Sequence, residues 1–472
     1  MAASALDIDA LRKGATPTRG EMAKIVIALS MPAILAELST TLMQYIDAAM
    51  VGSLGAHATA SIGLVESSIW LIEGVAMTAS AGFTVQVAQL IGAGRDKEAR
   101  NVFRQALVTL LVFGSLLAVV GVAVSGSLPI WLGGDPSIHA DAALYFRICM
   151  FALMPITMAR LGTGMLQCSG DMRTPSLLNI LSCVLNVICN ALFIHEGPVL
   201  QLGTLALPVP GMGLGIAGAA YGTLVAQVIT AVLLLLFACT RSERLALREK
   251  GVWVPQRSTI APAWRISWPL FIERIVTQSA YIVLTAIVAP LGVTSVAANS
   301  LAITVEAVCY MPGFGIGMAA TTLVGQSVGA ERKDLARSFA RLSTLLGTIV
   351  MTAMGALMYL AAPLVMSMLT PDVAVQELGA TVLRIEAFAE PLYAVSMVAS
   401  GAMRGAGDTL VPTIFSLVSM WGARILPSFY VAAHFGLVGV WVVMACELSF
   451  RGILFLIRLL RNRWLNHEIR TA

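Results

Sequence analysis

One carboxylate lies inside the first hydrophobic stretch of the chain. The stretch from Leu38 to Gly55 has the sequence LSTTLMQYIDAAMVGSLG and carries Asp47 as its only charge. An aspartate at the centre of a membrane-spanning helix costs about 2.5–3.5 kcal/mol, so a functional role is the default interpretation. A carboxylate binds H⁺ or Na⁺, and its affinity for either changes with its surroundings. The alternative is an acid at the helix end that reaches interfacial water.

A second group of charges falls in hydrophobic stretches of the second half. Glu306, Glu390 and Arg424 each lie too far from the end of a predicted span to reach the interface easily. Mutual pairing is the least costly arrangement for such charges. Such pairing would occur either in a structural salt bridge or in a coupling or substrate site. We expect Glu273 to form a local pair with Arg274.

Two further acids of the first half are candidate site residues. Glu66 and Glu73 are seven residues apart and therefore share a helical face that could line a cleft.

The chain has no spacing typical of a metal centre or of a nucleophile with its base. We expect no metal beyond Na⁺ at Asp47, no cofactor and no enzymatic activity. The seven cysteines are interpreted as apolar fillers, and four histidines fall at predicted outer helix ends: His57, His139, His195 and His434.

The composition places these residues in a membrane. Of the 472 residues, 58% are hydrophobic and only 12% are charged, which is typical of a polytopic membrane protein. The first twenty residues lack the apolar run of a cleavable signal. We predict an all-α integral membrane protein with twelve transmembrane helices, at about 23–50, 60–90, 101–125, 142–167, 176–197, 215–240, 263–290, 297–327, 338–362, 378–402, 410–434 and 437–462.

Basic residues orient these helices. The two tails, the even-numbered connections and the span ends beside them hold 24 of the 30 lysines and arginines, and the odd-numbered connections hold none. By the positive-inside rule both termini are cytoplasmic. The net charge of +4 reflects these inward loops rather than nucleic-acid binding.

The chain also contains an internal repeat. At an offset of 237 residues, one register of identities extends from the first span of each half to the fifth. Beyond that the offset falls to 221, so the first half carries extra residues in the loop 195–212. The identical pairs include Ser30/Ser267, Pro32/Pro269, Gln89/Gln326, Gly92/Gly329, Arg104/Arg341, Gly170/Gly407 and Asp171/Asp408.

Six spans per half is an even number, so the two halves cross the membrane in the same orientation. We therefore predict two six-helix lobes related by a pseudo-twofold axis along the membrane normal, with a central cleft and alternating access. The predicted parts are an N-terminal tail (1–22), an N-lobe with helices 1–6 (23–240), a cytoplasmic linker (241–262), a C-lobe with helices 7–12 (263–462) and a C-terminal tail (463–472).

The buried charges do not follow the repeat. Asp47 aligns with Leu284, and Arg424 aligns with Val187. The scaffold is duplicated whereas the intramembrane charge is not, which favours one-sided chemistry.

Five motifs along the chain form a recognisable set. The motifs are YIDAAMVGSLG around Asp47, QLIGAG at 89–94, SGDMRTP at 169–175, MPGFGIGMAATTLVGQSVGA at 311–330 and RGAGDTLVP at 404–412. In their order and repeat spacing they resemble the multidrug and toxic compound extrusion (MATE) transporters. The resemblance covers roughly Pro32 to Arg458.

The resemblance implies a secondary antiporter that exports organic compounds in exchange for H⁺ or Na⁺. The family's first-helix aspartate falls on Asp47, its fifth-helix Asn-x-x-x-Asp pair on Asn186 and Asn190, and its sixth-helix threonine on Thr223. The second acid is absent here. From the residues alone, Asn186 and Asn190 share a helical face and could bind a cation, bond Asp47 or join helices. Thr223 could equally bond its own helix backbone.

Other transporter classes fit less well. No GxxxxGK[ST] motif or nucleotide-binding domain indicates ATP-driven transport. A flippase for a lipid-linked precursor remains the alternative, but it would be expected to line its cavity with basic residues. When the basic residues at the cytoplasmic span ends and Glu196 at an outer end are counted with the connections, the predicted spans instead contain nine acids and six arginines.

The acid excess and the 23 methionines favour amphipathic, mostly cationic organic substrates. The expected partners are these compounds and membrane lipid, with no nucleic acid. We expect a monomer in the plasma (inner) membrane of the cell.

Overall fold

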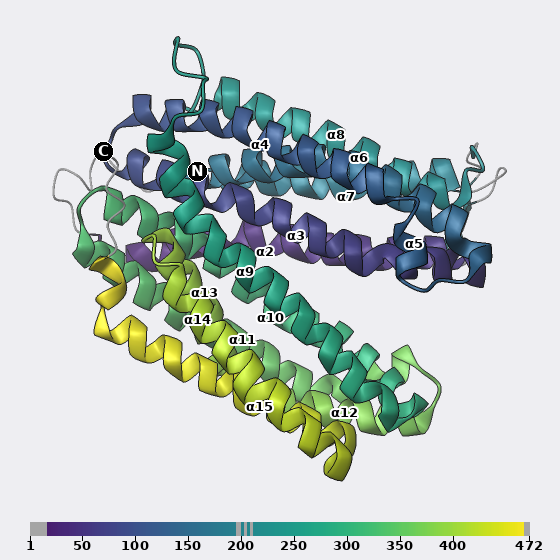
Figure 1. Ribbon diagram of the computed structural model, residues 1–472. Coiled ribbons are helices and arrows are strands. Elements are labelled where there is room, and N and C mark those ends of the chain that lie inside the picture. Colours follow the sequence, from purple (N-terminus) through teal and green to yellow (C-terminus); the bar gives the residue numbers. More distant parts are fainter. Residues whose placement is uncertain (1–16, 195–199, 203–204, 208–210, 467–472) are drawn as a thin grey trace. The chain divides into compact units, whose positions relative to one another are not determined.

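Helices make up almost the whole described chain. The computed structural model describes residues 17–194, 200–202, 205–207 and 211–466 (Figure 1). Within these residues one antiparallel two-stranded sheet joins β1 (Leu200–Leu202) to β2 (Leu205–Leu207), with Leu200 opposite Leu207. This sheet lies in the loop where the first half carries its extra residues, and the sequence prediction did not include it.

Long helices follow one another through the first half. Figure 1 shows α4, α6, α7 and α8 side by side. In chain order the helices are α2 (Arg19–Gly52), α3 (Ala56–Gly92), α4 (Asp96–Val124), α5 (Leu128–Trp131), the 3-10 helix η1 (Pro136–Ile138), α6 (His139–Cys168), α7 (Arg173–Ile194), α8 (Gly215–Leu236) and the π-helical turn η2 (Phe237–Arg241).

The second half repeats this organisation with more interruptions. Its fourth and fifth helices are each divided by a break or an irregular turn. The helices are α9 (Arg257–Val288), the 3-10 helix η3 (Ala289–Leu291), α10 (Val293–Gly329), α11 (Lys333–Leu369), α12 (Val373–Ala387), α13 (Glu390–Gly405), α14 (Leu410–Val418), the π-helical segment η4 (Ser419–Ile425), α15 (Leu426–Arg461) and the 3-10 helix η5 (Arg463–Asn466).

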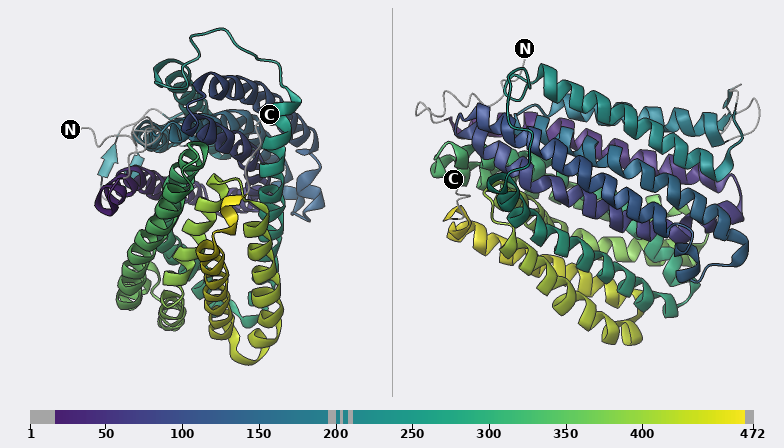
Figure 2. Two further views of the ribbon diagram at one scale, coloured as in Figure 1. Left: turned by 90° about the vertical axis from the view of Figure 1, so that its left-hand side faces the viewer. Right: turned by 45° about the horizontal axis from the view of Figure 1, so that its top comes forward.

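In the described residues each of the twelve predicted spans is mostly helical. Ten helical runs in the described residues are long and apolar enough to cross a membrane. One of them, Leu410–Arg461, reverses direction at Gly436 (φ 59°, ψ −149°) and so contains the last two predicted spans (Figure 2). The predicted span 378–402 is shared between α12 and α13, each of which is shorter than a full span.

The repeat is visible in the backbone. Gly55 and Gly292, which are 237 residues apart, adopt nearly the same positive φ, +98° and +96°. Each ends one helix and allows the chain to turn into the next, in a conformation that residues with a side chain rarely adopt.

Packing divides the chain into two compact units. The N-terminal unit comprises Leu38–Val87 and Asp96–Trp264. The C-terminal unit comprises Arg265–Ala472 together with Ala88–Arg95 and the chain up to Glu37. The start of α2 and the end of α3 therefore pack with the second half of the chain, which the repeat alone does not indicate.

Within the C-terminal unit, α3 and α10 cross at equivalent glycines. A Cβ atom on Gly92 would stand 2.0 Å from the Gln326 carbonyl oxygen, and one on Gly329 would stand 1.9 Å from the Gln89 carbonyl oxygen. These residues are two repeat pairs. The contact is therefore reciprocal, and it brings the backbones so close that only glycine fits.

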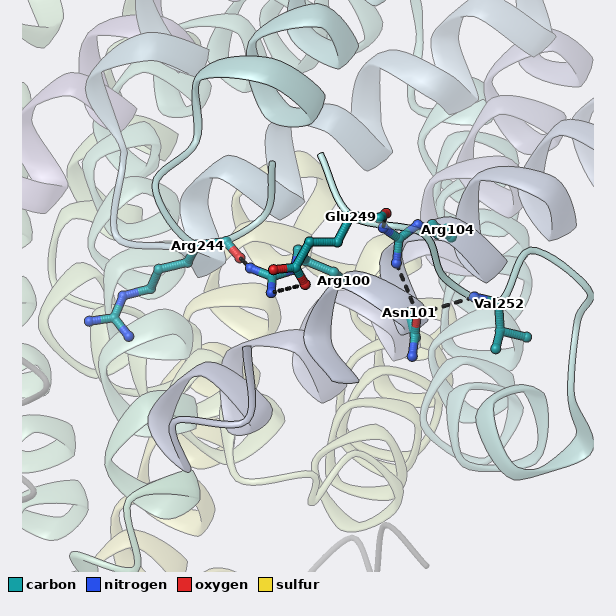
Figure 3. Close-up of polar contacts among 6 residues, drawn as sticks. All are labelled: Arg100, Asn101, Arg104, Arg244, Glu249 and Val252. Atoms are coloured by element: carbon teal, nitrogen blue, oxygen red, sulfur yellow. Dashed lines mark hydrogen bonds and ion pairs between the residues drawn. The ribbon is translucent and has the colours of Figure 1, made fainter. Parts of the chain in front are cut away.

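In the N-terminal unit, the linker that follows η2 is attached to the start of α4 (Figure 3). Arg100 donates to the Glu249 carboxylate at 3.0 Å, and buried Arg104 donates to the Glu249 carbonyl oxygen. Asn101 Oδ1 accepts from the Val252 amide at 3.2 Å. These basic residues, which the sequence assigns to membrane orientation, thus also hold the linker in place.

Candidate functional site

Asp47 is the centre of a polar cluster in the N-terminal unit. It lies on α2 and is half-buried, whereas Asn186 and Asn190 lie on α7 and are almost completely buried. Asn190 Nδ2 donates to Asp47 Oδ1 at 2.8 Å and to Asn186 Oδ1 at 3.1 Å. Asn186 Nδ2 donates to the Thr223 hydroxyl on α8 at 3.0 Å. The structure therefore brings together the four residues of the first half on which the family's aspartate, Asn-x-x-x-Asp pair and threonine fall.

The Asn186 amide has a second hydrogen-bonding arrangement available. If its oxygen and nitrogen exchange places, the nitrogen donates to both Asp47 oxygens, at 2.7 and 3.1 Å, and the oxygen accepts from Thr223 at 3.0 Å. Thr223 also bonds the Ala219 carbonyl of its own helix. The cluster can thus present Asp47 with one amide donor or with two.

One acceptor in the cluster has no hydrogen bond. Asn190 Oδ1 is buried and unpartnered, although its amide nitrogen contacts Asp47. A buried polar atom without a partner is costly, and native proteins rarely retain one without a reason. The oxygen atoms of the cluster that could bind a cation come from a carboxylate, amides and a hydroxyl. This set fits H⁺ or Na⁺, both of which bind hard oxygen ligands.

Gly222 on α8 leaves the space that the Asn190 side chain occupies. A Cβ atom at this position would stand 1.9 Å from Asn190 Oδ1, which is far inside van der Waals contact. The absence of a side chain at Gly222 therefore determines where the Asn190 amide can lie, and through it the hydrogen bond to Asp47.

If the cluster serves the antiport that the family resemblance implies, we expect Gly222→Ala to displace the Asn190 amide and to reduce gradient-driven export about tenfold or more, because the loss of about 1.5 kcal/mol from a charged hydrogen bond corresponds to that factor. The measurement is the initial export rate in proteoliposomes, with membrane insertion checked by size-exclusion chromatography. Gly63→Ala is the matched control, since nothing lies within 4 Å of the added methyl group. Equal rates for the two variants would contradict this role for Gly222.

Glu66 and Glu73 both lie on α3 in the N-terminal unit. Glu66 is exposed and interacts electrostatically with Tyr145 of α6, as does Asp47. Glu73 interacts with Cys149, one helical turn further along α6. Both acids therefore lie within electrostatic range of α6, and their shared cleft-lining face stays a prediction.

The charges of the second half lie in the interior of the C-terminal unit. Glu306 is on α10, Glu390 begins α13 and Arg424 is in η4, and all three are buried. Glu306 and Arg424 interact electrostatically. However, within the described chain no ion pair of 4.0 Å or shorter joins Arg424 to either acid, and its Nη2 contacts the Met444 sulfur instead. The expected direct pairing is therefore not formed.

The expected local pair between Glu273 and Arg274 is wrong. Glu273 Oε2 lies 3.4 Å from Arg404 Nη2 and accepts from the Thr413 hydroxyl at 3.0 Å. Adjacent residues on a helix point in different directions, so Glu273 reaches across to α13 and α14 instead. Its position is that of a structural link between three helices.

One family model matches both halves of the chain. The MatE family model matches residues 32–192 and again residues 269–430, and together these segments cover more than half of the chain. The two matches begin 237 residues apart, which is the offset of the internal repeat.

The chain belongs to the MATE family. It is similar along almost its whole length to curated multidrug resistance proteins. The probable multidrug resistance protein NorM of Thermotoga maritima is 27% identical over 453 residues, with 96% of this chain and 95% of the relative covered. The multidrug resistance protein PmpM of Pseudomonas aeruginosa is 27% identical over 448 residues, with 93% and 91% covered.

Solved structures agree with this MATE fold. A mutant of the Vibrio cholerae MATE transporter VcmN has a TM-score of 0.85 at 18% identity, with 96% of this chain and 99% of that chain covered. A MOP superfamily transporter from Pyrococcus furiosus has a TM-score of 0.85 at 22% identity, with 98% and 100% covered. The predicted fold class, twelve helices in two six-helix lobes of a multi-pass membrane protein, is confirmed.

The MATE chain also contains buried charges that the sequence did not single out. Glu386 near the end of α12 is fully buried, and so is Glu447 on α15, which lies 3.2 Å from Arg451. Glu386 interacts electrostatically with Glu306, Glu390 and Arg424. The sequence shows Glu386 as an acid inside a predicted span. No neighbouring residue distinguishes it from an acid near a helix end.

Histidine and cysteine side chains form no metal site in the part of the chain that the structure describes, where no group of three or more His, Cys, Asp or Glu residues could hold a metal ion. None of the seven cysteines, all of which lie in described residues, forms a disulfide bond. Of the four histidines named from the sequence, His195 lies outside the described residues, and His139 bonds the Gly134 carbonyl at 2.7 Å.

Proposed function

We propose that this MATE-family protein is a secondary antiporter that exports amphipathic, mostly cationic organic compounds in exchange for H⁺ or Na⁺. One observation carries the proposal: the Asp47 carboxylate is bonded by neutral amides, and no ion pair in the described chain joins it to a basic residue. A carboxylate at membrane depth requires a compensating positive charge. A mobile cation supplies that charge and can leave when the surroundings of Asp47 change.

The repeated scaffold supports alternating access. Two halves with the same orientation and reciprocal contacts can exchange between inward-open and outward-open arrangements. Coupling then follows if the cation and the substrate favour different arrangements, because a ligand shifts a conformational equilibrium only through its differential affinity. The chain itself catalyses no chemical change of the substrate, and its only cofactor is the coupling ion.

The substrate class follows from the charge of the interior. Carboxylates in low dielectric attract organic cations much more strongly than exposed carboxylates do. The relatives NorM and PmpM are described as multidrug resistance proteins, which fits a broad range of organic compounds. Flexible methionine side chains suit an adaptable apolar surface.

The orientation follows from the basic residues. We infer that both termini lie in the cytoplasm and that the protein resides in the cytoplasmic membrane, acting as a monomer in contact with lipid. Substrate would then be taken up from the cytoplasm or the inner leaflet and released outside.

We expect inverted membrane vesicles that contain the protein to accumulate ethidium when their interior is made acidic or Na⁺-rich relative to the outside. Ethidium fluorescence reports the uptake. A protonophore should abolish uptake driven by the pH gradient, and a Na⁺ ionophore should abolish uptake driven by the Na⁺ gradient. The gradient that drives uptake identifies the coupling ion. Vesicles from cells without the protein are the control.

The same experiment separates the flippase alternative. Transport of anionic lipid-linked sugars, with no response to ethidium under either gradient, would overturn the export proposal in favour of a flippase. Ethidium uptake that survives collapse of both gradients would overturn the antiport mechanism.

A further inference from the structure

The linker between η2 and α9 differs from the other even-numbered connections of the chain. It comprises residues 242–256 and contains no helix or strand. The other even-numbered connections have three or four residues and no tryptophan, and they are 93–95, 169–172, 330–332 and 406–409. A connection of about 15 residues without secondary structure is uncommon in a compact domain and is usually either functional or disordered.

This linker is held in place, because one side of it is bonded to α4 (Figure 3). Arg104 donates to the Glu249 carbonyl oxygen, and Gln105 Oε1 accepts from the Gln256 amide at 2.9 Å. Gly251 passes so close to α4 that a Cβ atom on it would stand 2.0 Å from Arg104 Nη1. The path of the linker from Glu249 to Gln256 is therefore fixed by polar contacts with the N-terminal unit.

Three consecutive apolar side chains lie on the exposed side of this path. Val252, Trp253 and Val254 are 36%, 49% and 73% exposed. The Val252 amide binds Asn101, and Figure 3 shows the Val252 side chain extending away from that contact. Exposed apolar side chains that lie next to one another mark a surface for a partner or a membrane. The tripeptide Val252–Val254 therefore fits an apolar environment that the rest of the chain does not supply.

The first turns of α9 continue this exposed surface. Thr259 and Ala263 are buried, and a Cβ atom on Gly82 of α3 would stand 2.0 Å from the Ala263 carbonyl oxygen. Arg257 and Trp264 are seven residues apart on the opposite face of α9, and Trp264 is 64% exposed. Tryptophan is enriched where a membrane helix meets the headgroups. Because Trp264 lies near the start of the seventh predicted span, the preceding linker lies at the level of the headgroups.

The exposed charges around the tripeptide are mostly basic. In the segment 241–257, which the structure describes completely, the two acids are Glu243 and Glu249, and Glu249 is paired with Arg100 at 3.0 Å. Each basic residue near an anionic membrane surface strengthens binding about fivefold. The exposed basic side chains of this segment outnumber the remaining acid, and they are Arg241, Arg248, Lys250 and Arg257.

We propose that the linker surface, which consists of Arg248–Val254 together with Arg257 and Trp264, binds anionic phospholipids of the leaflet on which it lies. Trp253 and the two valines enter the boundary between headgroups and acyl chains, and the basic side chains contact lipid phosphates. This is the division of labour of an interfacial anchor, in which apolar burial and charge attraction act together. The contacts with α4 join the bound lipid to the N-terminal unit.

This lipid contact goes beyond the proposed export function, because it requires no gradient, no substrate and no part of the Asp47 cluster. The linker is the covalent connection from the first half of the chain to α9. Bound lipid would therefore hold the start of α9 at the membrane surface. An acidic protein partner would match the same charge, but the exposed Trp264 on a membrane-spanning helix favours lipid.

Quenching of tryptophan fluorescence by brominated phospholipids tests the proposal, because bromine quenches a tryptophan only at close range. The full chain is placed in nanodiscs of phosphatidylcholine and phosphatidylglycerol, and one lipid or the other carries bromine near its headgroup. The difference between the wild type and Trp253→Phe gives the Trp253 contribution. We expect phosphatidylglycerol to bind at Trp253 at least fivefold more strongly than phosphatidylcholine at low salt. This ratio should fall toward one in 1 M NaCl, where the Debye length is about 3 Å.

Lys250→Gln should lower the ratio about fivefold, since it removes one basic residue from the surface. Trp131→Phe is the matched control. Trp131 is 68% exposed, and the connection that contains it has no lysine or arginine, so its contribution should be quenched equally by the two lipids. If Trp253→Phe does not insert, Val254→Asp keeps Trp253 and should lower the ratio measured on the whole protein, because it places an anion beside the headgroups.

Three results would overturn the proposal. Quenching of Trp253 by neither lipid would show that the linker surface contacts water or a protein partner. Equal quenching by both lipids, or a ratio that Lys250→Gln leaves unchanged, would show that anionic headgroups are not its ligand. Asp47→Asn should leave the ratio unchanged, so failure of the export proposal and failure of this one are distinguishable.

Discussion

We expect Asp47→Asn to abolish gradient-driven export in proteoliposomes while leaving the protein folded and inserted. Asparagine keeps the shape of the side chain and can still bond the amides of Asn186 and Asn190, but it binds neither H⁺ nor Na⁺ as a counter-charge. The cation that exchanges with substrate then has no site in the N-terminal unit. The measurement is ethidium export under an imposed pH or Na⁺ gradient, compared with binding of the same dye in the absence of a gradient.

Graded variants of the neighbouring residues sharpen this test. Asn186→Ala should weaken coupling more than Thr223→Ala, because Asn186 can bond Asp47 whereas Thr223 bonds Asn186 and its own helix. Glu243→Gln is the control, since Glu243 is an exposed acid in the linker of the same unit. Export at the wild-type rate by Asp47→Asn would remove Asp47 from the mechanism.

The Asp47 cluster shows how far the sequence carries a site prediction. The spacing of Asn186 and Asn190 puts both on one face of α7, and the charge of Asp47 requires a partner or a cation. The sequence left open whether the asparagines bond Asp47 or only join helices. That choice depends on the packing of α2, α7 and α8, and on the space that Gly222 leaves for Asn190.

The second half was less predictable because its important contacts join distant segments. Glu390 and Glu306 were recognised from their depth in apolar stretches, but Glu386 was recognised only after the break between α12 and α13 placed it beside them. Likewise, Glu273 pairs with Arg404, 131 residues away, rather than with its sequence neighbour. Helix periodicity shows which face a residue occupies, not which helix that face meets.

The repeat predicts the backbone better than it predicts the side-chain partners. Asp171 and Asp408 are equivalent residues in the two halves. Asp171 Oδ1 accepts from the amides of Arg173 and Thr174 and so caps the start of α7. Asp408 forms an ion pair with Arg458 of α15 and is almost fully buried, with a side chain 1% exposed. The motif of the second half therefore carries a long-range ion pair to another helix.

This difference predicts unequal effects of the same substitution. We expect Asp408→Asn to destabilise the protein by about 3–5 kcal/mol, because it leaves the mostly buried Arg458 guanidinium without its counter-charge. Asp171→Asn should be nearly neutral, because asparagine caps a helix about as well as aspartate does. Thermal unfolding in detergent, followed by the intrinsic fluorescence of the tryptophans, measures both variants under identical conditions.

A double variant separates the ion pair from other effects of the Asp408 change. If the cost arises from an uncompensated Arg458, then Asp408→Asn combined with Arg458→Gln should be less destabilised than Asp408→Asn alone, since neither buried charge remains. Strictly additive losses would show that the two side chains contribute independently. Equal losses for Asp171→Asn and Asp408→Asn would show that the duplicated motif performs one common role, capping, in both halves, and that the contact between α15 and Asp408 adds nothing to stability.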